Sequence, residues 1–427
     1  MIERIINQLG KANISVYKVN METVESVELF FIKKALDMNR KKKVTHYKVT
    51  VYKDFEENEE TYRGSSEVDI YPTMKDEEIE KILKDGLYAA GFVKNKFYPL
   101  VKGEKALEVT IPSKFSGFSL EEGAMVIQKA LYKNDVFQQG GINSSEIFLN
   151  KSTKRIVNSE GVDVSFVKFS SEIECITQWI EDQDVELFNV FSYGDLDEEL
   201  IAESVKDAIE LTKWRVRAKG AVKTGSYKVL LRKLALKEMF SYYTEKASVG
   251  AVYNKLSNFK PGEIVQGENI SGDKVTITLK GSSPYDNDGL KLEEVVIMEE
   301  GILRTYHGNT RFSHYLGIEP TGNLDEVIVA CGEKSMEKMK QEPYLELLAF
   351  SDFQMDSLTG NFAGEIRLGF YYDGENLSPV TGGSMSGNIK NVQNKMFLSK
   401  EVYKDGRFTG PKMLELFNIN IAGDTNN

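Results

Sequence analysis

The sequence predicts an α+β protein with an N-terminal domain of mixed helices and strands and a C-terminal, β-rich domain whose strands are mostly antiparallel. Three observations lead to this class. Helical and strand periodicities alternate in the first half of the chain. Short strand patterns separated by glycine turns occupy the second half. The length of 427 residues is enough for two or three domains, at about 150 residues per domain.

Four helices are expected in the first half. The first covers Met21–Asn39, where apolar residues recur at helical spacing, and the basic run 39–43 is expected to come directly after it. Thr73 and Asp76 have the form of a capping box that opens the second helix, and Gly91 ends it. The third helix starts near Ser119, and the fourth is opened by Asp195 or Asp197.

Strands are expected between and after these helices. In the first half they cover Val44–Lys53, Ser145–Asn150 and Val162–Phe169, and in the second half they include Gly225–Leu231 and Glu365–Tyr372. One further helix, Leu234–Lys246, comes after the strand at 225–231. The weakly patterned basic stretch Trp214–Lys223 is the expected boundary, which gives domains 1–217 and 218–427.

Charge and composition exclude several classes of protein. The 54 basic and 65 acidic residues give a net charge of −11, which disfavours nucleic acid as the main partner. No apolar run approaches the roughly 18 residues of a membrane span, and Glu3 and Arg4 interrupt any signal-peptide pattern. The two cysteines, Cys175 and Cys331, fit a reducing compartment. We therefore expect a soluble, cytoplasmic protein without membrane contact.

Residues that carry catalytic chemistry are scarce. The three histidines, His46, His307 and His314, lack the spacing of a zinc site, so we expect structural or solvated roles for them. The glycine-rich segment 382–388 lacks the lysine of a phosphate-binding loop, and it carries Met385 where a hydrolase elbow needs a nucleophile. The turn at 286–289 does not fit a calcium-binding EF-hand loop. No self-sufficient active site, catalytic residue, metal ligand or cofactor is therefore predicted.

Several motifs, in order, carry a family resemblance. They are Asn158-Ser159-Glu160-Gly161, Thr224–Leu231, Ser283–Gly289, Asp356–Phe362 and Pro379–Asn388. As a set, these motifs resemble the TldD/PmbA family over residues 141–424. The resemblance implies a two-domain protein of a cytoplasmic metalloprotease system, once described as a modulator of DNA gyrase. It also implies a structural or substrate-chamber role for the motif residues Asn158, Gly161, Asp286, Gly289, Thr359, Gly360, Pro379, Gly387 and Asn388.

The family resemblance also implies which of two kinds of subunit this chain is. The TldD kind binds zinc through His-Glu-x-x-x-His on a helix and a distant cysteine, and the TldE (PmbA) kind lacks these ligands. The corresponding helix here, Leu234–Lys246, contains Glu238 and Glu245 but no histidine, and residues 398–427 contain no cysteine. The chain therefore resembles a zinc-free, TldE-type subunit that is non-catalytic alone and shapes a peptide chamber or stabilises a partner.

The expected partner is a TldD-like catalytic subunit or a second copy of the chain, and the expected substrate is a peptide or unfolded polypeptide. Two alternatives stay open at this point: a stand-alone peptide-binding protein, and a gyrase-linked regulator without proteolysis. The sequence leaves open the substrate's identity, the existence of a catalytic partner, and homodimer versus heterodimer.

Overall fold

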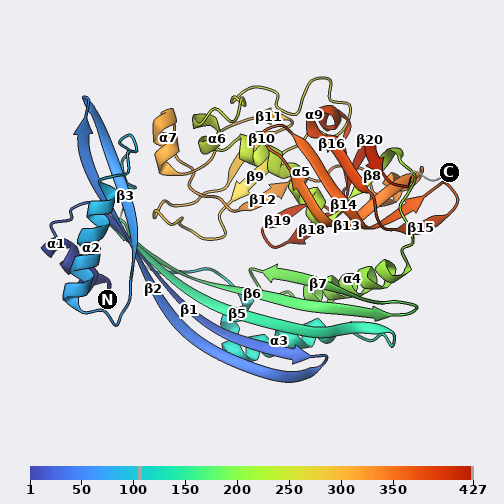
Figure 1. Cartoon of the computed structure of the whole chain (residues 1–427), viewed down its shortest axis with the longest axis horizontal. Coiled ribbons are helices and arrows are strands. Elements are labelled where there is room, and N and C mark those ends of the chain that lie inside the picture. Colours follow the sequence, from blue (N-terminus) through green and yellow to red (C-terminus); the bar gives the residue numbers. More distant parts are fainter. Residues whose placement is uncertain (104–107, 425–427) are drawn as a thin grey trace.

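The computed structural model describes residues 1–103 and 108–424. Residues 104–107 and 425–427, which the predicted domains include, lie outside the described residues. A long curved sheet forms the lower part of the molecule in Figure 1, and the C-terminal half of the chain lies over its concave side. Within the described residues, no helix combines the length and the apolar character needed to cross a bilayer.

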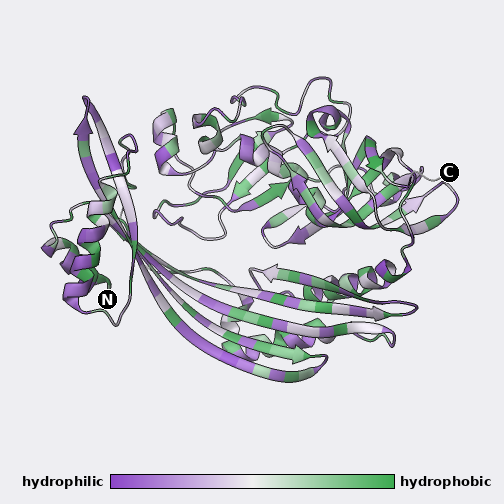
Figure 2. Cartoon of the chain, viewed as in Figure 1, coloured by the Kyte–Doolittle hydropathy of each residue, from purple (hydrophilic) through white to green (hydrophobic). Residues whose placement is uncertain are grey.

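The first sheet has seven strands in the order β3-β2-β1-β5-β6-β4, with β7 paired to β6. Its strands are β1 (Tyr17–Ile32), β2 (Ala35–Glu57), β3 (Glu60–Ile70), β4 (Val109–Thr110), β5 (Gly140–Asn158), β6 (Asp163–Ile180) and β7 (Asp184–Tyr193). The helices around it are α1 (Ile2–Lys11), α2 (Asp76–Ala90), the 3-10 turn η1 (Lys114–Gly117), α3 (Leu120–Tyr132) and α4 (Glu198–Arg217). In Figure 2, apolar and polar residues alternate along these strands, as expected where one face packs on helices.

Two further sheets form the second half. The six-stranded sheet, in the order β11-β10-β9-β12-β19-β18, contains β9 (Ile277–Lys280), β10 (Val295–Glu299), β11 (Ile302–Leu303), β12 (Glu326–Val329), β18 (Val402–Asp405) and β19 (Phe408–Pro411). The seven-stranded sheet, in the order β13-β8-β20-β16-β14-β15, contains β8 (Gly225–Leu231), β13 (Tyr344–Met355), β14 (Asn361–Tyr372), β15 (Leu377–Val380), β16 (Ser384–Asn388) and β20 (Leu414–Ala422), with β17 (Phe397–Leu398) paired to β20. Because β13 also pairs with β14, five of these strands close into a small barrel.

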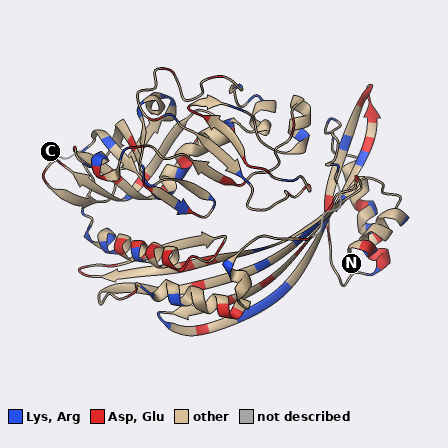
Figure 3. Cartoon of the chain, turned by 180° about the vertical axis from the view of Figure 1, so that it is seen from behind, with Lys and Arg blue, Asp and Glu red and all other residues tan. Residues whose placement is uncertain are grey.

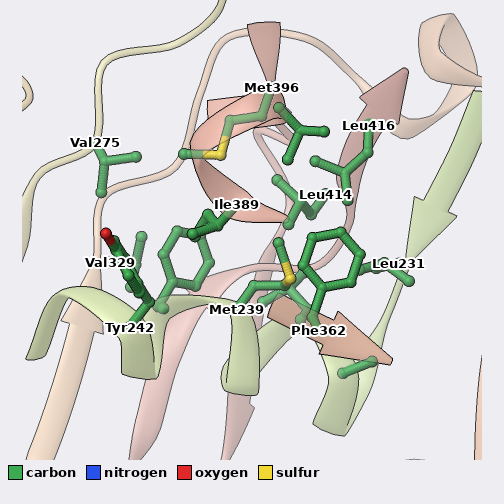
Figure 4. Packing of buried hydrophobic residues seen from close by; sticks show 14 of the residues in the cluster. Leu231, Met239, Tyr242, Val275, Val329, Phe362, Ile389, Met396, Leu414 and Leu416 are labelled. Atoms are coloured by element: carbon green, nitrogen blue, oxygen red, sulfur yellow. The ribbon is translucent and has the colours of Figure 1, made fainter. Parts of the chain in front are cut away.

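The remaining helical segments of the second half are α5 (Lys233–Lys246), α6 (Val249–Tyr253), α7 (Thr310–Leu316), α8 (Met336–Met339), α9 (Ile389–Val392) and the 3-10 turn η2 (Gln393–Lys395). Helix α5 lies in the largest apolar core, where its residues Met239 and Tyr242 pack among side chains from both sheets (Figure 4). This arrangement confirms the predicted α+β class. Most strand pairs are antiparallel, and the described parallel pairs are β4–β6, β8–β13 and β12–β19.

The predicted helix at Met21–Asn39 is wrong. These residues form most of β1 and the start of β2, joined by a tight turn after Ile32. Val27, Leu29 and Phe31 are buried and alternate along β1, a period-two pattern that competes with the helical spacing. Pairing with β2 on one side and β5 on the other decides for the strand. The basic run 39–43 consequently lies inside β2, where Arg40 and Lys42 pair with the buried Glu28.

The capping box at Thr73 is also wrong, because α2 begins at Asp76 with Lys75 as its N-cap. The amide of Lys75 donates to the Glu78 carboxylate at 2.7 Å, so the reciprocal pair lies two residues further along. The caps of the next helices are as predicted: Ser119 opens α3 in a capping box with Glu122, and the Asp197 carboxylate accepts from the Leu200 amide at 3.1 Å.

Candidate functional site

Helix α5 occupies the place at which the resemblance implies zinc ligands in catalytic subunits. It presents Glu238, which is half-buried, and Glu245, which is exposed. Burial raises the pKa of Glu238, and the like charge of Glu245 raises it further. Among the described residues, no group of three or more His, Cys, Asp and Glu side chains is arranged to hold a metal ion. The residues of α5 therefore do not fit the zinc of the catalytic subunits.

The histidine nearest to α5 is already bound to the helix. His307 Nε2 lies 2.8 Å from the carbonyl oxygen of Thr244, and this contact requires Nε2 to carry the proton because a carbonyl only accepts. Burial lowers the pKa of His307, so the ring is neutral at neutral pH. His46 and His314 are exposed, as predicted. His307 consequently caps the C-terminal turn of α5 and has no free nitrogen on that side for a metal.

Two motif turns from different halves of the chain meet, and we call residues 158–161 and 286–289 the junction turns. Asn158 is 6% exposed, and its Oδ1 accepts from the amides of Glu160 and Val162 at 2.8 and 3.0 Å. Asp286 is 5% exposed, and its Oδ1 accepts from the amides of Asp288 and Leu290 at 2.8 and 3.1 Å. Each side chain therefore holds its own turn closed, although burial raises the pKa of Asp286.

Two glycines allow the junction turns to approach. Gly161 and Gly289 have φ angles of +95° and +80°, which other residues rarely adopt. A Cβ on Gly289 would lie only 2.5 Å from Cγ1 of Val162. Beside this contact, Lys18 Nζ donates to Oδ1 of Asp288 at 2.5 Å. The predicted residues Asn158, Gly161, Asp286 and Gly289 are therefore brought together where the first sheet meets the second half.

A second pair of motif turns lies on the barrel, and we call residues 359–360 and 387–388 the barrel turns. Asn388 Nδ2 donates to the carbonyl of Thr359 at 3.2 Å, and the Ile389 amide donates to the carbonyl of Gly360 at 2.8 Å. A Cβ on Gly387 would lie 2.4 Å from the Phe362 ring. Pro379 lies apart from these turns, in β15 opposite Phe370. Thr359, Gly360, Gly387 and Asn388 thus form one packed group, separate from the junction turns and from Pro379.

Two cavities of about 760 and 700 Å³ lie between the first sheet and the second half, and we call them together the cleft. The larger one is lined by Lys168 from β6 and by Glu326 and Arg407 from the second half. Lys168 and Glu326 are half-buried, and neither makes an ion pair within the described part of the chain. Burial lowers the pKa of Lys168, with a further contribution from Lys154, and burial raises the pKa of Glu326. The cleft therefore offers both signs of charge to a ligand, and acidic and basic residues are interspersed along the sheet below it (Figure 3).

Sequence patterns did not single out the residues of this cleft. Lys168 lies in a predicted strand, Val162–Phe169, but nothing in that strand distinguishes it from a solvated lysine. Glu326 is separated from Lys168 by more than 150 positions, so no local motif joins them. The motif turns at Asn158 and Asp286 had been singled out near the cleft, and their neighbours Ile156 and Asn287 line the smaller cavity.

Comparisons with known proteins agree with the motifs. Residues 224–423 match the model of the PmbA/TldA metallopeptidase C-terminal domain. A Methanocaldococcus jannaschii protein of uncharacterised function is 23% identical over 387 residues, which cover 78% of this chain and 86% of that protein. A Methanothermobacter thermautotrophicus protein named as a metalloprotease is 30% identical over 150 residues, covering 30% of this chain and 32% of its own length.

The fold has a known counterpart as well. The crystal structure of TldE from Thermococcus kodakarensis superposes with a TM-score of 0.77 at 14% identity, covering 98% of this chain and all of that one. At this identity the likeness concerns the fold, and it extends through both halves. The match of residues 224–423 assigns the second half of this chain to the C-terminal domain of the PmbA/TldA metallopeptidase family, and the whole chain shares the fold of TldE.

Proposed function

We propose that this chain is the zinc-free, TldE-like subunit of a TldD/TldE-type metalloprotease system that acts on peptides or unfolded polypeptides. The observation that carries the proposal is the donor set of α5. The helix supplies two glutamates but no histidine or cysteine, and the nearby His307 donates to a helix carbonyl. A catalytic zinc activates water only when it is held by three protein ligands with one open position.

The cleft supports a role in shaping the substrate chamber. An extended peptide presents backbone amides and carbonyls together with side chains of either charge. The two cavities of about 760 and 700 Å³ lie along the concave face of the sheet, and Lys168 and Glu326 are unpaired there within the described residues. In this proposal the partner is a TldD-like subunit that brings the zinc, or a second copy of this chain that completes the chamber without chemistry.

The test is reconstitution of peptidase activity. The chain is incubated with a fluorogenic unfolded polypeptide alone, with a family member that carries His-Glu-x-x-x-His, and with that member after zinc removal. We expect cleavage only in the mixture that contains the zinc-loaded partner, and a rate above that of the partner alone. Zinc-dependent cleavage by this chain alone contradicts the proposal.

A stand-alone peptide-binding protein is the second candidate, and the open polar cleft favours it. It predicts retention of an unfolded polypeptide without cleavage and without any partner. A gyrase-linked regulator is disfavoured, because a chain with a net charge of −11 repels DNA. Steeply salt-dependent DNA binding that is lost on neutralising Arg215–Lys223 would revive that alternative.

A further inference from the structure

A small pocket lies at the junction turns, next to the cavity of about 700 Å³, with which it shares Lys18. Its volume is about 230 Å³, and it lies between β1, β2 and the segment 98–101 on one side and α7 with loops of the second half on the other. The residues of its lining that determine which ligand it can hold are Lys18, Tyr52, Tyr98, Asp288, Thr310 and Arg311. Because both halves contribute, we call it the junction pocket. Neither the zinc chemistry of the family nor the proposed subunit role uses it.

The charges of the junction pocket do not balance. Lys18, Arg311 and Asp288 are the charged residues of its lining. Lys18 pairs with Asp288 at 2.5 Å, which neutralises both. Arg311 is half-buried and donates to the amide oxygen of Asn95 at 3.2 Å, but it has no carboxylate within ion-pair distance in the described residues. One positive charge is therefore left in a chain whose net charge is −11.

Neutral hydroxyl groups line the same pocket as that charge. Burial raises the pKa of Tyr52 and of Tyr98, so both phenols keep their protons at any physiological pH and can donate them. Thr310 Oγ1 is buried and has no hydrogen-bond partner among the residues that the structure describes. Leaving a buried hydroxyl without a partner is unfavourable, so an occupant that satisfies it is favoured.

The walls of the junction pocket are held in place by contacts between the two halves. Tyr315 Oη donates to the carbonyl of Lys96 at 2.6 Å, and the rings of Tyr98 and Tyr315 meet edge to face at 6.2 Å. The guanidinium of Arg311 lies 4.5 Å from the centre of the Phe312 ring. The contacts of Arg311 with Asn95 and Phe312 hold its side chain, so a ligand has less to order, which lowers the entropic cost of binding.

We propose that the junction pocket binds a compact carboxylate, through an ion pair with Arg311 and hydrogen bonds from the hydroxyl groups of Tyr52, Tyr98 and Thr310. A carboxylate carries one negative charge, which matches the single uncompensated cation, and arginine is the residue best suited to bind its two oxygens. A volume of about 230 Å³ lies below that of typical drug-sized pockets, so the occupant is small. The carboxylate belongs either to a free small acid or to the C-terminus of a peptide.

The experiment compares an acid with its neutral isostere. N-Acetylglycine and N-acetylglycinamide are titrated into the full chain, and binding is followed by calorimetry and by the thermal midpoint. We expect saturable binding of the acid and at least about tenfold weaker binding of the amide, since the charge-assisted contacts are lost. Equal affinities for acid and amide, or no binding of either, overturn the proposal. Inorganic phosphate is a second probe, and binding of phosphate in preference to the acid also overturns it.

Variants identify the pocket. Arg311→Gln should weaken binding of the acid by at least about tenfold, and Tyr52→Phe should weaken it less while leaving the ring in place. Arg304→Gln is the matched control, because Arg304 pairs with Glu299 outside the junction pocket and should not change the affinity. If Arg311→Gln does not fold, the affinity of Tyr52→Phe for N-acetylglycine tests the proposal instead. An affinity equal to that of the wild-type chain then contradicts it.

Two further titrations separate the sources of the carboxylate. A tetraglycine with a free C-terminus and its C-terminal amide are compared with N-acetylglycine. Tighter binding of the free tetraglycine than of N-acetylglycine assigns the junction pocket to peptide C-termini, and weaker binding assigns it to free acids. None of these readouts involves zinc or cleavage. Failure to bind a carboxylate therefore does not argue against the proposed zinc-free subunit role, and failure of that role does not argue against carboxylate binding.

Discussion

The junction turns and the barrel turns belong to one set of family motifs, yet their surroundings differ. The junction turns join the two halves and border the junction pocket, and their polar side chains are occupied with closing the turns. The barrel turns pack on β14 and α9, where Gly387 lies against the ring of Phe362. One set of motif residues therefore builds a boundary that can hold a ligand, and the other builds a core. Shared motif membership does not imply a shared role.

The largest expected effect of a single substitution is at the junction. Gly289→Ala adds a Cβ 2.5 Å from Val162 at a φ of +80°, so strain and overlap add. We expect a loss of about 3 kcal/mol in the free energy of unfolding, measured by urea denaturation. Gly10→Ala is the control, because a Cβ there meets no described atom within 4 Å outside its own helix, and this variant should be neutral or slightly stabilised. Equal stability of the two variants contradicts the packing described for the junction turns.

A smaller loss is expected at the barrel. Gly387→Ala places a Cβ 2.4 Å from the Phe362 ring, but the φ angle of Gly387 is not positive, so only overlap contributes. We expect a loss of about 2 kcal/mol, in the range of overpacked cores. If this variant also weakens the binding of N-acetylglycine at temperatures where it remains folded, the separation between the two groups of turns is wrong.

The pH dependence of stability tests the capping role of His307. Burial lowers its pKa in the folded chain below the ordinary value of 6.5, so the unfolded chain binds the proton more tightly between these two values. Stability is therefore fully present above about 6.5 and falls as the pH is lowered through and below it. We expect His307→Gln to reduce this slope between about pH 7.5 and 5.5. The assignment is contradicted if lowering the pH over this range stabilises the wild-type chain relative to the variant.

The smallest effect on stability is expected in the cleft. Lys168 is half-buried and has no ion pair within the described residues, so Lys168→Met removes a desolvated charge. We expect a stability change of less than about 1 kcal/mol, with a gain favoured. The same variant should bind an acidic unfolded polypeptide more weakly, as measured by fluorescence anisotropy at low salt. Lys84→Met, at an exposed position on α2, is the control for loss of charge. If both variants bind the acidic polypeptide equally well, Lys168 and the cleft around it do not contribute to substrate binding.

Local signals explain which elements were predictable. Ser119 with Glu122, and Asp197 with Leu200, are capping contacts within four residues, so α3 and α4 were found with their starting points. Strand β1 was missed because its pairing partners, β2 and β5, decide its conformation, and β5 lies more than 100 residues away. Asn158 and Asp286 were singled out through the family resemblance, and no sequence pattern predicted that their turns would meet. Lys18, Tyr52 and Arg311 carry no shared motif, and only the folded chain brings them together. The division into domains at residue 217 stays a prediction.

The central claim is that this chain holds no zinc of its own, and metal analysis tests it most directly. The purified chain is equilibrated with a small excess of zinc, desalted, and measured by mass spectrometry of the metal beside a His-Glu-x-x-x-His family member treated in the same way. We predict zinc far below one equivalent in this chain and close to one in the other. One tightly held zinc per chain here would contradict the account.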